Sequence, residues 1–389
     1  MVSRRHTHNK LSRRTFIRNI SAATAGAIGG ALGEKICASA DATGPADTPK
    51  ILNYNPKMGY RRLGKTGLMI SEVSLGGHWK DRQGQRYWEK FANEEVPADV
   101  AKNRIEVISA CIDAGVNYLD ISTSAECLAY GVALQGRRDK MVIGADDYKL
   151  CARKPENCKV DRLMFDIEQC CRKLKTDYLD IWRVKADMYG GSTDAHVETM
   201  IETFQKARKA GKVRHFGISS HCRAWLEHVI ETFRELEFVS FPCTAKTKEK
   251  GKPVAKENVE EVNAGYGADT EQSIFQAVRK CDIGVIAIKP FLGGKLFKLR
   301  TRFPVSGVGD RQEHELARLT LQCILTNEAI TTTVPGLTTI YEVENAVRAS
   351  YIRTHGMTAA DKDWLLRVTE ERWAALPREY TWLREWEFV

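Results

Sequence analysis

Short apolar runs rich in β-branched residues alternate with helix-length amphipathic segments from about residue 59 onward. Ala-Gly pairs close two of the helical segments just before the next apolar run, at Ala114-Gly115 and Ala210-Gly211. A glycine stop of this kind is typical of a helix that leads into a strand. The pattern predicts eight strands, at residues 70–74, 117–120, 141–145, 179–184, 213–219, 238–241, 284–289 and 331–334.

Eight strands that follow helices at this rhythm indicate right-handed βαβ units and a parallel sheet. We therefore expect an α/β fold in which residues 59–389 form one (β/α)8 TIM barrel. The alternative is a doubly wound open sheet, but no G-x-G-x-x-G motif follows an early strand. A small amino-terminal hairpin is predicted around residues 64–67.

Two stretches interrupt the rhythm of strands and helices. Residues 246–269 are long and rich in Lys, Glu and Gly, and they follow a strand, so they are a candidate lid or partner surface at the barrel mouth. Residues 358–389 carry four tryptophans and are predicted to pack as a carboxyl-terminal helical extension and tail.

The positive charge of the chain is concentrated near its amino terminus. The net charge is +9, but seven of the 59 Lys and Arg residues and only one of the 50 Asp and Glu residues lie in the first 40 positions. The remainder is close to neutral, which argues against nucleic acid as a partner.

The leader resembles a twin-arginine export signal. Arg13-Arg14 is followed by Phe16, by an uncharged Ala- and Gly-rich run at 20–32, and by the small residues Ala38-Ser39-Ala40. We expect residues 1–40 to be a cleaved signal peptide, 41–58 a linker, the twin-arginine translocase a partner during export, and the location periplasmic or extracellular. The apolar run is too short and weak for a stable membrane span. The alternative is a basic disordered tail or a short amphipathic helix.

The chain has 11 cysteines at irregular spacing and no C-x-x-C pair, so no metal site is predicted. Most are expected to be buried free thiols, since a chain of this size needs no disulfides to fold. Cys151 and Cys158, which flank a loop, are the candidate disulfide pair. Redox chemistry at Cys127 is a weaker alternative for function.

Six segments in order along the chain carry a family resemblance: YRRLGKTGL at 60–68, DAGVNYLD at 113–120, YLDI at 178–181, VRHFGISS at 213–220, GVIAIKP at 284–290 and VPG at 334–336. Together they resemble the aldo-keto reductases over about residues 59–350. The resemblance implies a (β/α)8 barrel, hydride transfer between NADP or NAD and a carbonyl or alcohol, and a small-molecule substrate.

The resemblance also implies which residues contact the cofactor. Ser219 and Ser220 would hold the carboxamide, and Thr338 or Thr339 would cap the next helix beside the adenosine phosphate. No Arg or Lys lies within residues 337–340 to bind a 2′-phosphate, so NADP and NAD both stay open. The implied cofactor residues are Gly77, Ser219, Ser220, Lys289, Pro290, Phe291, Gly336, Thr338, Glu344 and Asn345.

The reaction chemistry of that family uses an aspartate, a tyrosine, a lysine and a histidine, and only Asp120 matches. Ala125 stands where the tyrosine is expected, Asp146 replaces the lysine, and Lys185 replaces the histidine. The segment from 121 to 130 is also shorter than the family pattern. Ordinary carbonyl reduction therefore lacks its usual proton donor.

We hypothesise that Lys185 pairs with Asp120, Asp146 or both, and that crowding raises the pKa of one carboxyl enough for general acid catalysis. Other candidate donors are His78, Glu126 and Tyr148. One alternative is a structural ion cluster without turnover. At the level of the whole protein, the alternative is a degenerate barrel that acts as a binding or scaffold protein.

Overall fold

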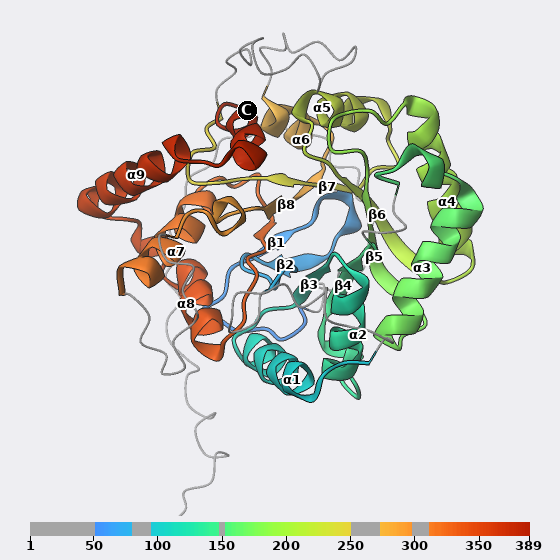
Figure 1. The fold of residues 1–389 in the computed structure, drawn as a ribbon, viewed down its shortest axis with the longest axis horizontal. Coiled ribbons are helices and arrows are strands. Elements are labelled where there is room, and N and C mark those ends of the chain that lie inside the picture. Colours follow the sequence, from blue (N-terminus) through green and yellow to red (C-terminus); the bar gives the residue numbers. More distant parts are fainter. Residues whose placement is uncertain (1–50, 80–94, 148–151, 250–272, 298–310) are drawn as a thin grey trace, which may run out of the picture. The chain divides into compact units, whose positions relative to one another are not determined.

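A parallel sheet of seven strands forms the centre of the protein, seen here in a computed structural model that describes residues 51–79, 95–147, 152–249, 273–297 and 311–389. The strands are hydrogen-bonded in sequence order (Figure 1). They are β3 (Tyr118–Ile121), β4 (Val142–Ala145), β5 (Leu179–Lys185), β6 (Val213–Ser219), β7 (Phe238–Pro242), β8 (Gly284–Ile288) and β9 (Thr332–Thr333).

A short extended stretch closes this sheet into a barrel. Val73 bridges Thr333 of β9 in parallel, and Leu75 bridges Leu119 of β3 in parallel. The Ser74 N–H donates to Thr333 O at 3.0 Å, and the Leu75 N–H donates to Tyr118 O at 3.1 Å. This stretch takes the place of the eighth barrel strand, so the predicted (β/α)8 barrel is confirmed.

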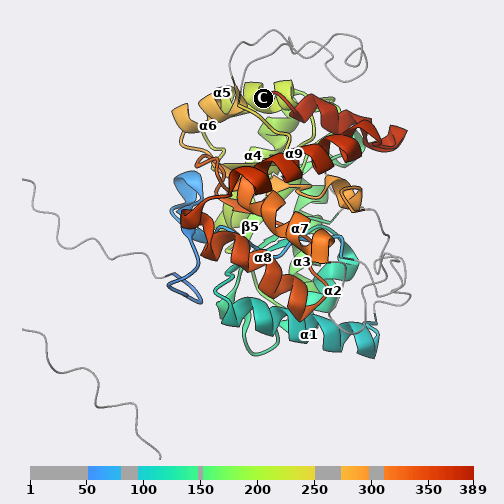
Figure 2. The same cartoon turned by 90° about the vertical axis from the view of Figure 1, so that its left-hand side faces the viewer.

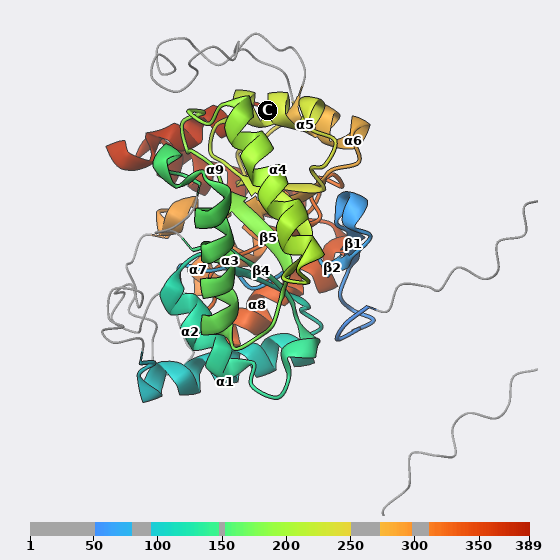
Figure 3. The same ribbon diagram turned by 90° about the vertical axis from the view of Figure 1, so that its right-hand side faces the viewer.

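The predicted first strand, 70–74, was wrong in one respect, because its residues divide between two structures. Residues up to Ser71 belong to β2 (Met69–Ser71), which pairs antiparallel with β1 (Tyr60–Arg62) in the predicted hairpin. The bonds to the barrel begin at Glu72, whose carbonyl oxygen accepts the Thr333 N–H of β9 at 2.9 Å. Figures 2 and 3 show the hairpin at one end of the barrel.

Helices cover the outside of the barrel, as Figure 1 shows. Their apolar residues face the strands because each helix presents a stripe at helical spacing. They are α1 (Ala98–Asp113), α2 (Ser124–Ala133), α3 (Val160–Leu174), α4 (Asp194–Lys209), α5 (Arg223–Thr232), α6 (Ile274–Lys280), α7 (Arg311–Ile324), α8 (Ile340–Tyr351) and α9 (Ala359–Ala374).

The inside of the barrel changes from apolar to polar along the strands. Next to the hairpin, Leu63 and Ile70 pack on inward side chains of the strands, among them Tyr118, Ile181 and Phe238. Because side chains on a strand alternate between its two faces, the residues two and four positions further on point inward as well. Those positions include Asp120 on β3, Arg183 and Lys185 on β5 and Ser240 on β7, so charged and hydroxyl groups gather toward the carboxyl ends of these strands.

The predicted carboxyl-terminal extension is present as α9 and a 3-10 segment, Arg378–Trp386. The Trp386 Nε1–H donates to His221 O at 2.9 Å, and its ring stacks on Phe241 of β7 at 5.1 Å. Lys246, at the start of the predicted insert, lies 2.8 Å from Glu387 Oε1 in an ion pair. The tail therefore packs against the ends of β6 and β7, as plain packing of its tryptophans predicts.

Several predictions lie wholly or partly outside the described residues: the signal peptide, most of the 41–58 linker, most of the 246–269 insert, Tyr148 and Cys151. The stretch 51–58 is described and packs on the barrel, where Asn53 Nδ2 donates to Val116 O at 2.8 Å. The nine described cysteines are free, and seven are buried, which confirms that prediction for them. Among the helices of the described ranges, none is long and apolar enough to cross a membrane.

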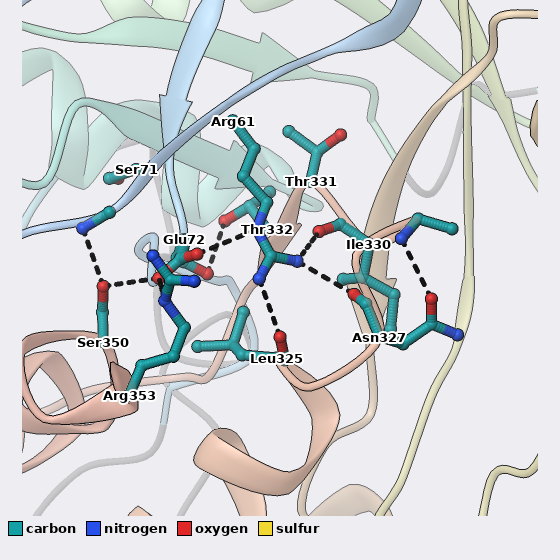
Figure 4. Close-up of polar contacts among 12 residues, drawn as sticks. Arg61, Ser71, Glu72, Leu325, Asn327, Ile330, Thr331, Thr332, Ser350 and Arg353 are labelled. Atoms are coloured by element: carbon teal, nitrogen blue, oxygen red, sulfur yellow. Dashed lines mark hydrogen bonds and ion pairs between the residues drawn. The ribbon is translucent and has the colours of Figure 1, made fainter. Parts of the chain in front are cut away.

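A buried carboxylate holds the underside of the barrel together (Figure 4). Glu72 is 0% exposed, and its two oxygens accept hydrogen bonds from Arg61 Nε at 2.8 Å and Ser350 Oγ at 2.7 Å. Arg353 Nε lies 2.9 Å from Glu72 Oε2. Arg61 also donates to the carbonyl oxygens of Leu325, Asn327 and Ile330. This cluster ties the hairpin to the end of α7 and to α8.

Replacing Glu72 by Ala should lower the free energy of unfolding by about 3–5 kcal/mol, because it leaves the buried Arg61 guanidinium without its counter-charge. Chemical denaturation of the two proteins would measure the difference. The control is Asp282→Ala, which breaks an ion pair with Arg62 whose side chains are both 52% exposed and should cost less than about 1 kcal/mol. Equal losses in the two variants would contradict the role given to Glu72.

Candidate active site

Asp120 lies inside the barrel near the end of β3 and is paired with an arginine. Its Oδ1 accepts hydrogen bonds from Arg183 Nε at 2.6 Å and from the Tyr118 hydroxyl at 2.8 Å. Arg183 also donates to Ile121 O and to Ser122 Oγ, each at 3.1 Å. Of the two carboxylates that the hypothesis offered to Lys185, Asp120 is therefore paired with Arg183. Burial and the Asp120 charge hold the pKa of Tyr118 well above its usual value, so this phenol stays protonated.

Lys185 ends β5 and reaches across the ends of the two preceding strands. Its Nζ donates to Ser122 O at 2.8 Å and to Asp146 O at 2.5 Å, and it lies 4.0 Å from Asp146 Oδ2. The same carboxylate oxygen accepts the Lys185 backbone N–H at 2.9 Å. The hypothesised pairing with Asp146 is thus present, and the ammonium group is 5% exposed.

The connection from β3 to α2 has only two residues, Ser122 and Thr123, which explains the shortened segment noted in the sequence. The Thr123 side chain caps α2 by accepting the Glu126 N–H at 3.2 Å. Ala125 consequently lies in the first turn of α2 and is buried. Cys127 lies on the same helix and is fully buried rather than in a loop, so its thiol is shielded from solvent.

Glu126 is a buried carboxyl group beside the barrel mouth. It accepts the Ser122 N–H at 2.7 Å and also the His78 N–H. Burial raises the pKa of Glu126, while these two hydrogen bonds and the Lys185 charge lower it. His78 is exposed and adopts a positive φ of 58°, and it contacts Glu126 through its backbone. Its role as an acid stays a prediction.

The candidate carboxamide residues are not equivalent. Ser219, at the end of β6, lies beside Lys185 of β5 and beside Ser240 of β7 in the sheet register. The Ser220 hydroxyl donates to Asp187 O, in the loop after β5, at 2.9 Å and accepts the Cys222 N–H of its own loop at 3.2 Å, so it is already engaged. Ser240 Oγ is buried and has no hydrogen-bond partner within the described ranges. A carboxamide supplies both donors and acceptors, so the Ser219–Ser240 pair fits that end of a nicotinamide cofactor.

Sequence reasoning missed Ser240 and Arg183. The alternation along β5 offered a signal for Arg183, because Ile181, Arg183 and Lys185 share the inward face of the strand. Ser240 had no comparable signal, since a serine in a short apolar strand is common. Its significance comes only from its place beside Ser219.

The loop after β8 has an unusual backbone. Lys289 and Leu292 have φ values of 61° and 54°, and Gly293 and Gly294 also have positive φ. A Cβ on Gly293 would lie 2.3 Å from Tyr380 of the tail, so the tail packs directly on this glycine. Pro290 and Phe291 lie within this constrained loop, where their predicted contact with the cofactor pyrophosphate stays a prediction.

The amino terminus of α8 is occupied by the protein itself. Glu342 Oε2 accepts the N–H groups of Thr338 at 2.6 Å and Thr339 at 3.1 Å, in a capping box. Burial raises the pKa of Glu342 to about 7. Thr339 is the N-cap of α8, as predicted for Thr338 or Thr339, and the contact of either residue with the adenosine phosphate stays a prediction.

The remaining predicted cofactor residues lie near this helix. A Cβ on Gly336 would lie 2.9 Å from Gly77 O. The loop after the Val73–Leu75 stretch and the loop after β9 therefore approach closely there. Asn345 Nδ2 donates to His314 O at 2.8 Å, so this amide is bound to α7, and Glu344 is exposed.

His221, which follows Ser220, is held by the tail. Its ring stacks on Trp382 with centroids 4.2 Å apart. Burial, followed by the charges of Lys289, Arg153 and His78, lowers its pKa well below the usual value, so the imidazole is neutral at pH 7. These four residues come from four different strand ends or loops, and they meet at the barrel mouth. In the part of the chain that the structure describes, no group of His, Cys, Asp and Glu is arranged to hold a metal ion.

The chain belongs to the aldo/keto reductase family, whose sequence model matches residues 90–358. It is 26% identical over 171 residues to an uncharacterized oxidoreductase, YqkF, of Bacillus subtilis, which covers 41% of this chain and 48% of that protein. The chain thus spans about half the length of this relative. It is 23% identical over 319 residues to L-galactose dehydrogenase of Arabidopsis thaliana, covering 75% of this chain and 88% of that enzyme.

Solved structures of the same family show the same fold. The aldo-keto reductase AKR11C1 of Bacillus halodurans in its holo form matches with a TM-score of 0.53 and 19% identity, over 80% of this chain and 96% of that one. An aldo-keto reductase of Klebsiella pneumoniae in complex with NADPH matches with a TM-score of 0.53 and 17% identity, over 80% of this chain and 95% of that one.

The raised pKa of Glu342 predicts how stability depends on pH. A carboxyl whose pKa is about 7 in the folded state and near 4.5 unfolded gives a contribution that is complete below the unfolded value and is lost as pH rises through 7. Glu342→Gln keeps an oxygen for capping and removes this titration. Thermal unfolding from pH 5 to 8 should therefore show the variant gaining stability relative to the native chain. Parallel pH curves for the two proteins would contradict the assignment.

Proposed function

We propose that this chain is an exported oxidoreductase that transfers a hydride between a nicotinamide cofactor and a carbonyl or alcohol substrate, using a non-standard proton donor. The observation that carries the proposal is the position of Lys185. Its ammonium group lies at the end of β5, between the ends of β3 and β4, and Ser219 is its neighbour in the sheet. Family membership supports the reaction class. Lys185 and Asp146 depart from the family pattern, so their role is argued from their positions in this structure.

A nicotinamide cofactor, when bound, supplies or accepts the hydride. Ser219 and Ser240 would hold its carboxamide, and the loop at Lys289–Gly294 would lie along its pyrophosphate. Buried, rigid strand ends are suited to this task because they fix hydroxyl groups without reorganisation during the reaction.

The residues at the ends of β3 to β5 provide the proton. Hydride addition to a carbonyl carbon leaves an oxyanion that must take up a proton. Lys185 donates two of its three hydrogens to Ser122 O and Asp146 O, which leaves the third for the substrate oxygen. In reduction the proton passes from Nζ to the oxyanion, and in oxidation the neutral amine takes it from the alcohol.

Glu126 is the second candidate acid. Its two oxygens already accept backbone N–H groups of Ser122 and His78, which favour the ionised carboxylate. Both oxygens of Glu126 are thus engaged with the backbone, which makes Lys185 the better-placed donor. We therefore assign Glu126 the role of holding the His78 turn against the start of α2.

We propose NAD(H) as the preferred cofactor. Glu342 already binds the two N–H groups at the start of α8 and brings a negative charge to this end of the helix. A 2′-phosphate bound there would find the Thr338 and Thr339 N–H groups already bonded to Glu342. The carboxylate of Glu342 would also repel it. The solved reductase of Klebsiella pneumoniae, by contrast, carries NADPH.

Fluorescence titration with NADH and NADPH tests the proposal. We expect micromolar binding of NADH and weaker binding of NADPH. Lys185→Ala should bind NADH as the native protein does, but it should reduce a panel of aldehydes and ketones about 100-fold more slowly, because only proton donation is removed. The control is Lys206→Ala, which loses an exposed ion pair with Asp161 on the outer helices.

Two results would contradict parts of this proposal. The absence of binding of either dinucleotide at millimolar concentration would favour the alternative of a degenerate barrel that acts as a binding or scaffold protein. Unchanged turnover in Lys185→Ala would leave the reaction class standing and refute the proton donor.

Export by the twin-arginine route is proposed from the leader sequence. A cofactor acquired in the cytoplasm would explain why such a protein is exported already folded. Replacing Arg13 and Arg14 together by Lys should leave the precursor uncleaved in the cytoplasm, which fractionation and immunoblotting would detect. Unchanged appearance of the double variant in the periplasm would refute this route.

A further inference from the structure

A second aspartate lies directly behind the Lys185–Asp146 pair. Asp166 is on α3 and is 0% exposed, although it stands on the apolar face of that helix among Leu163, Ile167 and Cys170. Asp146, which follows β4, is 1% exposed. The two carboxyl side chains lie within hydrogen-bonding reach of each other.

Most of the carboxylate oxygens of this pair lack a hydrogen-bond donor. Within the described residues, both oxygens of Asp166 and Oδ1 of Asp146 are buried with no hydrogen-bond donor. The other oxygen of Asp146 accepts the Lys185 N–H. Two adjacent ionised carboxylates without donors are strongly unfavourable in a buried site. A single proton between them converts one acceptor into a donor and removes both the repulsion and the missing bond.

The surroundings of Asp166 favour its protonated form. Burial raises its pKa well above the usual value, and the nearby carboxylates of Asp146 and Asp147 act in the same direction. Lys173 is directed to Asp147 and Ser124 rather than to Asp166. The ionisable groups that face the pair from the packed elements are Cys170 on α3, Cys127 on α2, Asp146 and Asp147 after β4, and Lys185 on β5.

We propose that Asp146 and Asp166 share one proton at neutral pH and act as the proton reservoir that recharges Lys185. The pair is connected to Lys185 on one side only, through Asp146 Oδ2, which lies 4.0 Å from Nζ. Asp166 is thus a positioning and proton-supplying residue that does not touch the substrate.

The proton passes from Asp166 through Asp146 to Lys185. After Lys185 gives a proton to the substrate oxyanion, its neutral amine takes the proton held by the carboxyl pair. The O–H bond at Asp166 breaks as an O–H bond forms at Asp146 Oδ1. A half-turn of the Asp146 carboxyl group then brings this same proton to Nζ, where the O–H bond breaks and an N–H bond forms. Both carboxylates are then ionised, and a proton from solvent restores the pair. This relay rests on the proposed function, whereas the shared proton does not.

Infrared spectroscopy of the full chain tests the shared proton directly. At pH 7 the difference spectrum of native protein minus Asp166→Asn should show the C=O stretch of one protonated carboxyl group, because Asn retains a hydrogen bond to Asp146 without the acid. The contribution of Glu342, whose pKa is about 7, is the same in both proteins and cancels in the difference. The matched control is Asp161→Asn on the same helix, whose side chain is 97% exposed and which should leave the band unchanged. Identical spectra for native protein and Asp166→Asn would overturn the proposal.

Stability measurements provide a second readout that needs no spectroscopy. Because the folded pKa of Asp166 is raised, its contribution is complete below the unfolded pKa and is lost as pH rises through the folded value. Asp166→Asn should therefore gain stability relative to the native protein with increasing pH. If this variant does not fold, Asp146→Asn tests the same pair by the same loss of the infrared band.

Kinetic measurements on Asp166→Asn distinguish a failure of the proton relay from a failure of the proposed function. Asp166→Asn should bind NADH as the native protein does, should turn over about 100-fold more slowly with unchanged KM for NADH, and should lose the alkaline decline of the native rate. A normal infrared band with unaltered kinetics would overturn the relay and leave the shared proton in place. Failure of NADH to bind native protein would instead refute the proposed function.

Discussion

Closure of the sheet by the stretch around Val73–Leu75 is the constraint on which the site depends. The seven long parallel strands alone would form an open sheet with two free edges. The bonds from Ser74 to β9 and from Leu75 to β3 convert those edges into a ring. Only in a ring do the carboxyl ends of all the strands meet at one opening. The register of β4, β5 and β6 makes Lys185, Ser219 and Asp146 neighbours, and closure brings the loops after Leu75 and β9 to the same opening.

The interior of the barrel follows a simple rule of charge pairing. Water is largely excluded from it, so each charge that enters must bring a partner. Asp120 has Arg183, and Lys185 has Asp146 with two carbonyl oxygens. The underside follows the same rule through Glu72 and its arginines. The Asp146–Asp166 contact departs from this rule, because it brings two acidic groups together. The proposed shared proton removes their repulsion.

The carboxyl-terminal tail contributes to the mouth as well as to packing. Trp382 covers the ring of His221, and Tyr380 packs on Gly293 in the strained loop after β8. Positive φ at Lys289 and Leu292 costs free energy, and contacts of this kind can offset such a cost. A cofactor loop held in this way would be preorganised for binding.

The sequence by itself determined the eight-stranded barrel, its hairpin, the helical extension and the departure of Ala125, Asp146 and Lys185 from the family pattern. These features follow from periodicity and motif order, which are local properties of the chain. It did not determine which carboxylate Lys185 would join. Arg183, one inward position earlier on the same strand, took Asp120. The pairing of Asp146 with Asp166 needed α3 to pack behind β4, and the filling of the α8 terminus needed the side chain of Glu342 to turn back. Tertiary structure decided these points, because the free energy of a buried charge depends on neighbours that are distant in sequence.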